Sequence, residues 1–124
     1  MNKAKKYGLS ILMKYKSIDN TAVMFDIDDT LIFYNHKPNY PIIELAQCAH
    51  YLKIKIILIT ARPNFKENKI HTVQELKIFN IPYNLIVYVN HEKKAAIKRK
   101  MNYNFILSVG DMWTDLTDSL HWIK

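Results

Sequence analysis

The short stretch VMFDIDDTL, residues 23–31, places aspartates directly after an apolar run that is typical of a buried strand. Carboxylates this close repel one another, and burial makes the repulsion more costly. Asp26 and Asp28 are two positions apart, so an extended backbone directs both side chains the same way. A bound cation would neutralise them and offset the cost. The spacing therefore predicts a cation site that includes both carboxylates.

Polar side chains also follow the other apolar runs of the chain. Thr60 ends IKIILIT, Lys93 and Lys94 come after LIVYV, and Asp111 and Asp115 come after FILSVG. Asp111 would add a third carboxylate to the first two. A ligand set of oxygens, without a His or Cys cluster, favours Mg²⁺, which also shares substrate phosphates.

The remaining residue types suit phosphoryl transfer. The Thr60 hydroxyl and a lysine ammonium match the oxygens of a transferring phosphoryl group. One aspartate would act as the nucleophile, and a second would protonate the leaving oxygen. The chemistry predicted for this set is therefore metal-assisted transfer of a phosphoryl group through a carboxylate.

Helices and strands that must position these residues alternate along the chain. The patterns predict helices at 3–17, 41–53, 65–79, 91–101 and within 111–120, strands at 21–27, 54–60, 85–89 and 105–110, and a turn-rich loop at 33–40. Continuous apolar strands between amphipathic helices indicate a parallel sheet covered on both faces. With right-handed crossovers, this predicts an α/β fold, a three-layer α/β/α sandwich with a doubly wound, mainly parallel sheet. HWIK, 121–124, would be at most a short further strand.

In such a sheet, ligands bind outside the carboxyl ends of the strands. The polar residues described above stand at those ends. They are therefore expected to converge on one crevice.

The chain length and the cysteine content limit the possible classes of protein. A chain of 124 residues suits one domain, with a helical segment at 1–20 and a catalytic core at 21–120. The single cysteine, Cys48, forms no internal disulfide, which favours a reducing compartment. The sequence contains no signal-like segment and no apolar run of about 20 residues. A cytoplasmic location without a membrane partner is expected, and oligomeric state stays open.

The formal net charge of +7 admits two interpretations. It is consistent with a polyanionic partner such as nucleic acid. However, Lys, Ile and Asn are abundant, and arginine, which is the preferred phosphate ligand, occurs only at Arg62 and Arg99. Codon usage in an A/T-rich genome would produce the same composition. Both explanations stay open at this point.

The motifs DIDDT, ILIT, KK and GDMWTD, in this order, resemble those of the haloacid dehalogenase (HAD) superfamily of phosphohydrolases. The resemblance spans residues 22 to about 118. GDMWTDL together with ITARP is most similar to the acid-phosphatase-like branch. The resemblance implies a HAD-like Rossmannoid core and a Mg²⁺-dependent phosphatase that forms an aspartyl-phosphate intermediate.

The resemblance also implies a role for each matching residue. Asp26 would be the nucleophile, and Asp28 the general acid and then the base that activates water. Thr60 would hold a phosphoryl oxygen. Mg²⁺ would be bound by the Asp26 carboxylate, the backbone carbonyl of Asp28, and Asp111, with Asp115 as a second-shell or alternate metal partner.

The lysine and arginine roles have alternatives. Lys93 is preferred as the lysine that neutralises Asp26, because Ile97, four residues later, would pack that helix turn inward. Lys94 is the alternative, and would otherwise contact substrate. Arg62 directly follows Thr60 and would bind a second substrate phosphate or make a structural contact. Trp113 would stack on a base or sugar, although packing is the preferred interpretation.

The spacing of the motifs leaves no room for an inserted cap domain. Asp28, Thr60 and the lysine pair are separated only by the elements of the core. A capless site would be open and suited to a large or polyanionic phosphorylated substrate, including a nucleic-acid end or a nucleotide. Two alternatives remain, which are a phosphoreceiver-like signalling module and a non-catalytic HAD-like binding protein. Neither would turn over a phosphate ester.

Overall fold

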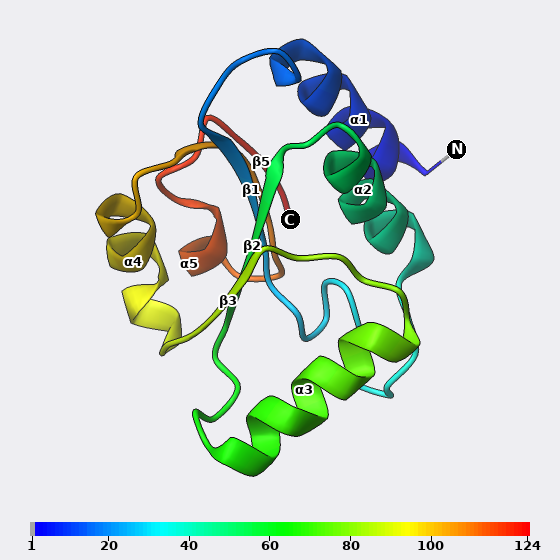
Figure 1. The fold of residues 1–124 in the computed structure, drawn as a ribbon, viewed down its shortest axis with the longest axis vertical. Coiled ribbons are helices and arrows are strands. Elements are labelled where there is room, and N and C mark those ends of the chain that lie inside the picture. Colours follow the sequence, from blue (N-terminus) through cyan, green and yellow to red (C-terminus); the bar gives the residue numbers. More distant parts are fainter. Residues whose placement is uncertain (1) are drawn as a thin grey trace.

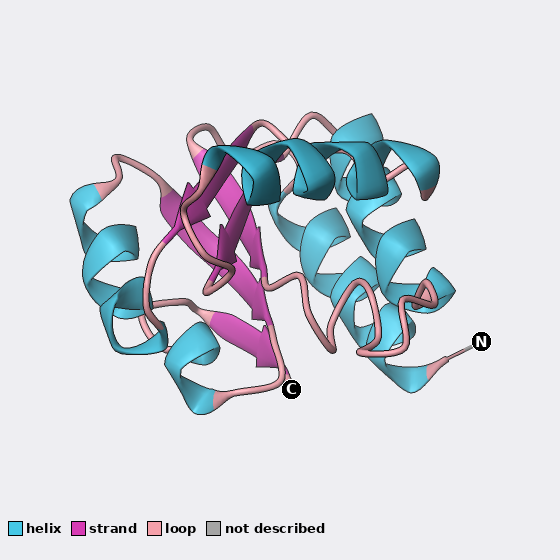
Figure 2. Ribbon diagram, turned by 90° about the horizontal axis from the view of Figure 1, so that it is seen from below, coloured by secondary structure: helices cyan, strands magenta, loops and turns pink. Residues whose placement is uncertain are grey.

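A parallel sheet of five strands forms the middle layer of the molecule, in the order β3-β2-β1-β4-β5 (Figures 1 and 2). The computed structural model describes residues 2–124. The strands are β1 (Thr21–Phe25), β2 (Lys55–Thr60), β3 (Leu85–Tyr88), β4 (Asn104–Val109) and β5 (His121–Ile123). The helices are α1 (Lys3–Tyr15), α2 (Tyr40–Tyr51), α3 (Lys66–Ile78), α4 (Lys94–Lys100) and α5 (Trp113–Leu116), with a 3₁₀ turn, η1 (His91–Lys93), before α4. The predicted doubly wound α/β sandwich is confirmed.

Helices α1, α2 and α3 lie on one side of the sheet, whereas α4 and α5 lie on the other (Figure 2). All the strand pairs are parallel, and Ile123 of β5 pairs with Val109 of β4. Residues 121–123 thus form a fifth strand, which is the short further strand considered for HWIK. Within residues 2–124, no helix has the length and apolar character needed to cross a membrane.

The strand order creates a switch point between β1 and β4. The chain passes outward from β1 through β2 to β3, and then crosses back to add β4 on the other side of β1. The connections on the two sides of β1 therefore diverge at the carboxyl ends of β1 and β4. Open parallel sheets bind ligands at such a point.

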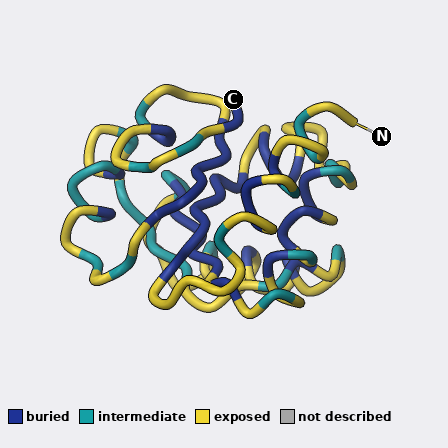
Figure 3. The backbone as a smooth tube through the Cα atoms, turned by 90° about the horizontal axis from the view of Figure 1, so that it is seen from above, coloured by how far each residue is buried: buried dark blue, intermediate teal, exposed yellow. Residues whose placement is uncertain are grey.

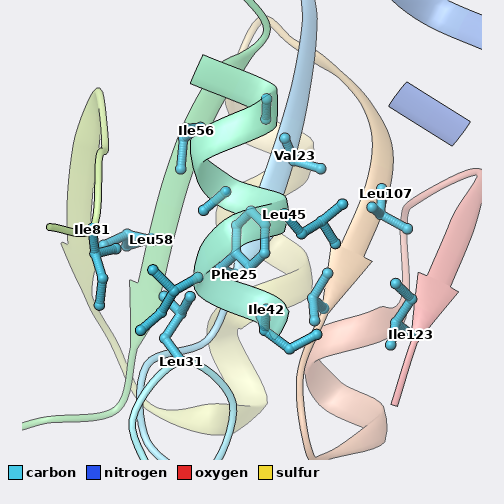
Figure 4. Packing of buried hydrophobic residues seen from close by; sticks show 14 of the residues in the cluster. Val23, Phe25, Leu31, Ile42, Leu45, Ile56, Leu58, Ile81, Leu107 and Ile123 are labelled. Atoms are coloured by element: carbon cyan, nitrogen blue, oxygen red, sulfur yellow. The ribbon is translucent and has the colours of Figure 1, made fainter. Parts of the chain in front are cut away.

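The sheet is held between two hydrophobic clusters. The larger one lies under α1 and α2 and includes Phe25, Leu45 and Leu58, all fully buried (Figures 3 and 4). The smaller one lies under α4 and includes Met24 and Phe105. Burying a side chain of this size contributes roughly 1.5–3 kcal/mol. Because β1 is buried along its whole length, its carboxyl end has a fixed position, and this fixes where the following loop begins.

The loop 26–39 between β1 and α2 is tied down at several places. Asp29 has a left-handed backbone (φ 59°), and its carboxylate accepts a hydrogen bond from the Tyr34 N–H at 2.9 Å. The Asn39 side-chain amide donates to the Thr30 carbonyl at 2.8 Å. Asp29 therefore stabilises the turn. These contacts fix the backbone that presents Asp26 and Asp28.

Candidate active site

Asp26 lies at the switch point, directly after β1. Its N–H donates to the Val109 carbonyl at 2.9 Å, so the pairing of β1 with β4 continues into this residue. The residue is only 4% exposed. The loop that follows it lies at the lower end of the sheet in Figure 1, on the same side as α3. A carboxylate in this position needs a compensating positive charge.

Lys94 supplies that charge. Its Nζ lies 3.0 Å from Asp26 Oδ1 and 2.6 Å from Asp115 Oδ1, and the lysine is fully buried. Lys93, the preferred position from the sequence, is exposed in the 3₁₀ turn and must be corrected to Lys94 as the lysine next to Asp26. Lys94 and Lys98 are the buried residues of α4, whereas Ile97 is only partly buried and Lys93 precedes the helix.

Asp111 joins the two carboxylates that contact this lysine. One oxygen each from Asp26, Asp111 and Asp115 lie within 4.8 Å of one another. Burial raises the pKa of Asp26 to about 8, Lys94 opposes the rise, and the nearby Asp115 adds to it. One ammonium does not balance three carboxylates, and all the donors are oxygens. The site therefore fits a divalent cation such as Mg²⁺.

The Asp28 side chain does not join this cluster, contrary to the expectation from its spacing. Its carboxylate accepts two hydrogen bonds from Arg62, from Nε at 3.0 Å and from Nη2 at 2.8 Å. Strand β1 ends at Phe25, so the extended geometry on which the spacing argument relied does not continue to Asp28. Binding of the metal by the Asp28 backbone carbonyl stays a prediction.

Gly110 allows Asp115 to approach the cluster. A Cβ on Gly110 would lie 2.4 Å from both Cβ and Oδ2 of Asp115, so only glycine leaves room for this side chain. Asp115 Oδ2 also accepts from the Met112 N–H at 3.2 Å. The GDMWTD segment thus folds back on itself, and the spacing between Asp111 and Asp115 brings both carboxylates to Asp26.

A second buried lysine, Lys98, holds the same segment and was not identified from the sequence. Its Nζ donates to the Ser108 hydroxyl at 3.1 Å, to the Asp115 carbonyl at 2.7 Å and to the Thr117 carbonyl. Burial lowers the pKa of Lys98 to about 8. Its position four residues after Lys94, on the same face of α4, was the available signal.

Arg62 lies between β2 and α3 and contacts protein groups on every side. Nη1 donates to Thr72 Oγ1 at 3.1 Å, and Nη2 lies 2.9 Å from Glu75 Oε1. Burial lowers the pKa of Arg62, but the hydrogen bonds and charges of Asp28 and Glu75 outweigh this and raise it above its ordinary value. Arg62 thus makes the structural contact that is one of the two sequence-based alternatives, and substrate binding by Arg62 stays a prediction.

Thr72 and Glu75 were missed because they look like surface residues of an ordinary helix. Both are buried, together with Leu76, on one face of α3. The only sequence signal for their burial was that Thr72 lies three residues before Glu75 and four before Leu76, as residues on one helix face do.

Thr60, which ends β2, is fully buried, and its hydroxyl accepts the Arg62 N–H at 3.1 Å.

Trp113 is 61% exposed, so the preferred interpretation of this residue as a packing residue is wrong. Lys124 Nζ lies 4.3 Å from the centroid of its ring, in cation–π contact. Tyr34, on the loop after Asp28, and Phe65, directly before α3, are also strongly exposed, at 84% and 64%. These aromatic side chains belong to segments that follow the carboxyl ends of β4, β1 and β2, respectively.

The fold and the acidic cluster at its switch point define an α/β protein with a candidate cation site. Residues 23–117 match the model of the haloacid dehalogenase-like hydrolases, and the chain belongs to this family. No curated protein matches the chain. The similarity to the acid-phosphatase-like branch stays a prediction.

Two solved structures are similar in fold. One is described as the Pnkp1/Rnl/Hen1 complex, with a TM-score of 0.64 and 21% identity over 79% of this chain and 41% of that chain. The other is described as the Pnkp1/Rnl/Hen1 RNA repair complex, with a TM-score of 0.65 and 20% identity over 77% of this chain and 37% of that chain. The chain therefore spans about two fifths of the length of these chains. At this identity, the likeness concerns the fold alone.

Proposed function

We propose that the protein is a Mg²⁺-dependent phosphomonoesterase that works through an aspartyl phosphate on Asp26. Membership of a hydrolase family supports hydrolysis as the reaction class. The observation that supports the proposal most directly is the buried Asp26 carboxylate, paired with Lys94 and next to Asp111 and Asp115. A buried carboxylate that is paired with a lysine at the switch point is suited to attack a bound phosphate.

In the first step, an Asp26 oxygen attacks phosphorus, and the bond from phosphorus to the leaving oxygen breaks. Asp28 gives its proton to that leaving oxygen. In the second step, Asp28 takes a proton from a water that attacks phosphorus, and the bond to Asp26 breaks to release phosphate. A positioned acid or base of this kind typically contributes about 10²–10⁴-fold in rate.

Other side chains would hold the phosphoryl group during both steps. The Lys94 ammonium neutralises charge on Asp26 and on the phosphoryl oxygens. The Thr60 hydroxyl would donate to one of these oxygens. A Mg²⁺ ion held by Asp26, Asp111 and the Asp28 carbonyl would supply further positive charge, and Asp115 would support these ligands or take the place of one of them.

The proposed substrate is a large or polyanionic phosphate ester, with a phosphorylated nucleic-acid end or a nucleotide as the leading candidate. Exposed aromatic side chains after the catalytic strand ends, such as Tyr34 and Trp113, provide faces for base stacking. The net charge of +7 favours a polyanion. The similarity in fold to chains of an RNA repair complex is compatible with this substrate class.

The test is hydrolysis of 4-nitrophenyl phosphate with Mg²⁺ and with EDTA, by the wild type and by Asp26→Asn. The matched control is Asp118→Asn, which removes an aspartate paired with Arg99 at the surface. Turnover that needs both the metal and Asp26 is expected. Phosphorylated oligonucleotides, nucleotides and sugar phosphates would then be compared by kcat/KM.

The two alternatives give different results in the same assay. A phosphoreceiver-like module would accumulate a long-lived phosphoaspartate without turnover. A non-catalytic binding protein would show neither phosphorylation nor turnover. Either result with folded protein, on the aryl phosphate and on the phosphorylated oligonucleotides, would contradict the proposed function.

A further inference from the structure

The orientation of the Asp28 carboxylate is set by Arg62. The Asp28 side chain is 53% exposed, so on its own it would rotate among several rotamers. Instead, Arg62 Nε donates to Oδ2 at 3.0 Å and Nη2 donates to Oδ1 at 2.8 Å. A bidentate contact of this kind fixes both the direction and the plane of a carboxylate.

Arg62 is itself held in place from two sides. Its side chain is only 14% exposed, and Nη1 donates to Thr72 Oγ1 of α3 at 3.1 Å. Its backbone N–H donates to the hydroxyl of Thr60 at 3.1 Å. The guanidinium is therefore fixed relative to both the end of β2 and α3. Because Arg62 binds both carboxylate oxygens of Asp28, the Asp28 side chain is also held in place, although it lies on a loop.

Glu75 gives the guanidinium a second carboxylate. Its Oε1 lies 2.9 Å from Arg62 Nη2, yet it is buried and makes no well-aligned hydrogen bond within residues 2–124. Nη2 is thus shared between Asp28 and Glu75. When Asp28 carries the proton that it donates, Glu75 still balances the charge of Arg62. An unpaired, largely buried guanidinium would otherwise be costly.

The geometry points to Arg62 as a positioning residue that directs the Asp28 carboxyl group toward the leaving-group oxygen, with Thr72 and Glu75 of α3 as its supports. The inference rests on the proposed function. Arg62 does not touch the reacting atoms. It holds Asp28 so that the proton passes from the Asp28 carboxyl group to the ester oxygen as the bond between that oxygen and phosphorus breaks.

Dependence on the leaving group tests this role, because a poor leaving group needs the proton more than a good one. The substrates are 4-nitrophenyl phosphate, phenyl phosphate and a primary alkyl phosphate. The variants are Arg62→Lys, which keeps the charge but cannot form the bidentate contact, and Thr72→Val, which removes one support without changing charge. Asp28→Asn is the reference for a lost acid, and Arg99→Lys is the control, since Arg99 pairs with Asp118 at the surface.

Arg62→Lys is expected to lower kcat/KM by about 10²-fold on the phenyl and alkyl esters, at the lower end of what a positioned acid contributes. The loss on 4-nitrophenyl phosphate should be much smaller, which is the pattern expected of Asp28→Asn. Thr72→Val should show the same selectivity with a smaller loss. Arg99→Lys should match the wild type on every ester. Thermal unfolding of each variant reports whether the fold is retained.

Three results would overturn the inference. An equal loss on all esters, in Arg62→Lys and Thr72→Val alike, would indicate a general structural role. No loss on any ester would show that Asp28 is positioned without Arg62. In both cases, selective loss in Asp28→Asn would leave the proposed function intact. Wild-type protein without Asp26-dependent turnover would overturn the proposed function and this inference together.

Discussion

The Lys94 ammonium lies 3.0 Å from the Asp26 carboxylate, although the two residues are 68 positions apart in the sequence. The lysine side chain is fully buried and that of Asp26 is 5% exposed. A buried ion pair is weak evidence for stability, because desolvation offsets most of its attraction. Its position at the switch point, beside two further carboxylates, favours a chemical role instead.

Replacing Lys94 should therefore abolish most of the activity, whereas replacing Lys93 should not. Lys94→Met leaves the phosphoryl charge without its buried cation, and we expect kcat to fall by about 10²–10³-fold. Lys93→Met changes an exposed side chain, and we expect kcat close to that of the wild type. Rates with an aryl phosphate check both variants, with circular dichroism to monitor the fold. A larger loss in Lys93→Met would contradict the placement of Lys94.

Mg²⁺ binding should release a proton and should strengthen as pH rises. Burial raises the pKa of Asp26 to about 8, so below that pH the metal-free carboxyl group is mostly protonated and must lose its proton to bind the metal. The logarithm of the affinity should rise with pH up to about 8 and then level off. Calorimetry in buffers with different ionisation enthalpies measures the proton release. Affinity that does not vary between pH 6 and 8 would contradict this expectation.

The same pKa shift predicts a pH-dependent stability for the metal-free protein. The pKa of Asp26 is raised from 3.8, so the folded state binds more protons than the unfolded state between these values. The contribution of Asp26 to stability is then present at low pH and is lost as pH rises toward 8. We expect metal-free Asp26→Asn to unfold at a higher temperature than the wild type at pH 8, and the difference to shrink toward pH 4. A constant difference across this range would contradict the shift.

Gly110→Ala should weaken Mg²⁺ binding, because the new Cβ would lie 2.4 Å from the Asp115 side chain and displace it. A steric change of this kind typically costs about 1–3 kcal/mol of stability as well. Gly8→Ala is the matched control. Its Cβ would meet the ends of the Leu45 side chain, so it should affect stability without changing Mg²⁺ affinity. Equal Mg²⁺ affinities in the two variants would argue against a role for Asp115 near the metal.

Lys98→Met should destabilise the fold. The substitution leaves the Asp115 and Thr117 carbonyls without the buried ammonium that donates to them. Each unsatisfied buried group costs about 1–3 kcal/mol, so the two carbonyls together predict a loss of roughly 2–6 kcal/mol in urea unfolding. The exposed Lys100→Met serves as the control. A loss no larger than that of the control would show that Lys98 does not hold the segment.

The order of helices and strands could be predicted from the sequence because the strands are continuous apolar runs. TAVMF and KIILIT are buried almost throughout, and a parallel sheet covered on both faces requires this pattern. The positions of Asp26, Thr60 and Asp111 followed from the strand ends. The short strand His121–Ile123 was less certain, because three residues carry little pattern.

Side-chain directions were harder to predict than positions. The choice between Lys93 and Lys94 depended on which face of α4 is buried, and the buried residues of that helix are the two lysines Lys94 and Lys98, which hydrophobic periodicity does not mark. The direction of Asp28 depended on Arg62, Thr72 and Glu75, which come together only in the tertiary structure. Thr72 and Glu75 are polar residues on a buried helix face, and they are there because they contact Arg62. An argument from hydrophobic periodicity therefore does not identify them.

The most direct test of the proposed function is to trap the phosphorylated residue. The protein is mixed with Mg²⁺ and an aryl phosphate, quenched with borohydride, and mapped by mass spectrometry, because reduction of an aspartyl phosphate yields homoserine. We expect homoserine at position 26, and none in Asp26→Asn, which should also lack turnover. Turnover that persists in Asp26→Asn, or homoserine at a different aspartate, would contradict the assignment of Asp26 as the nucleophile.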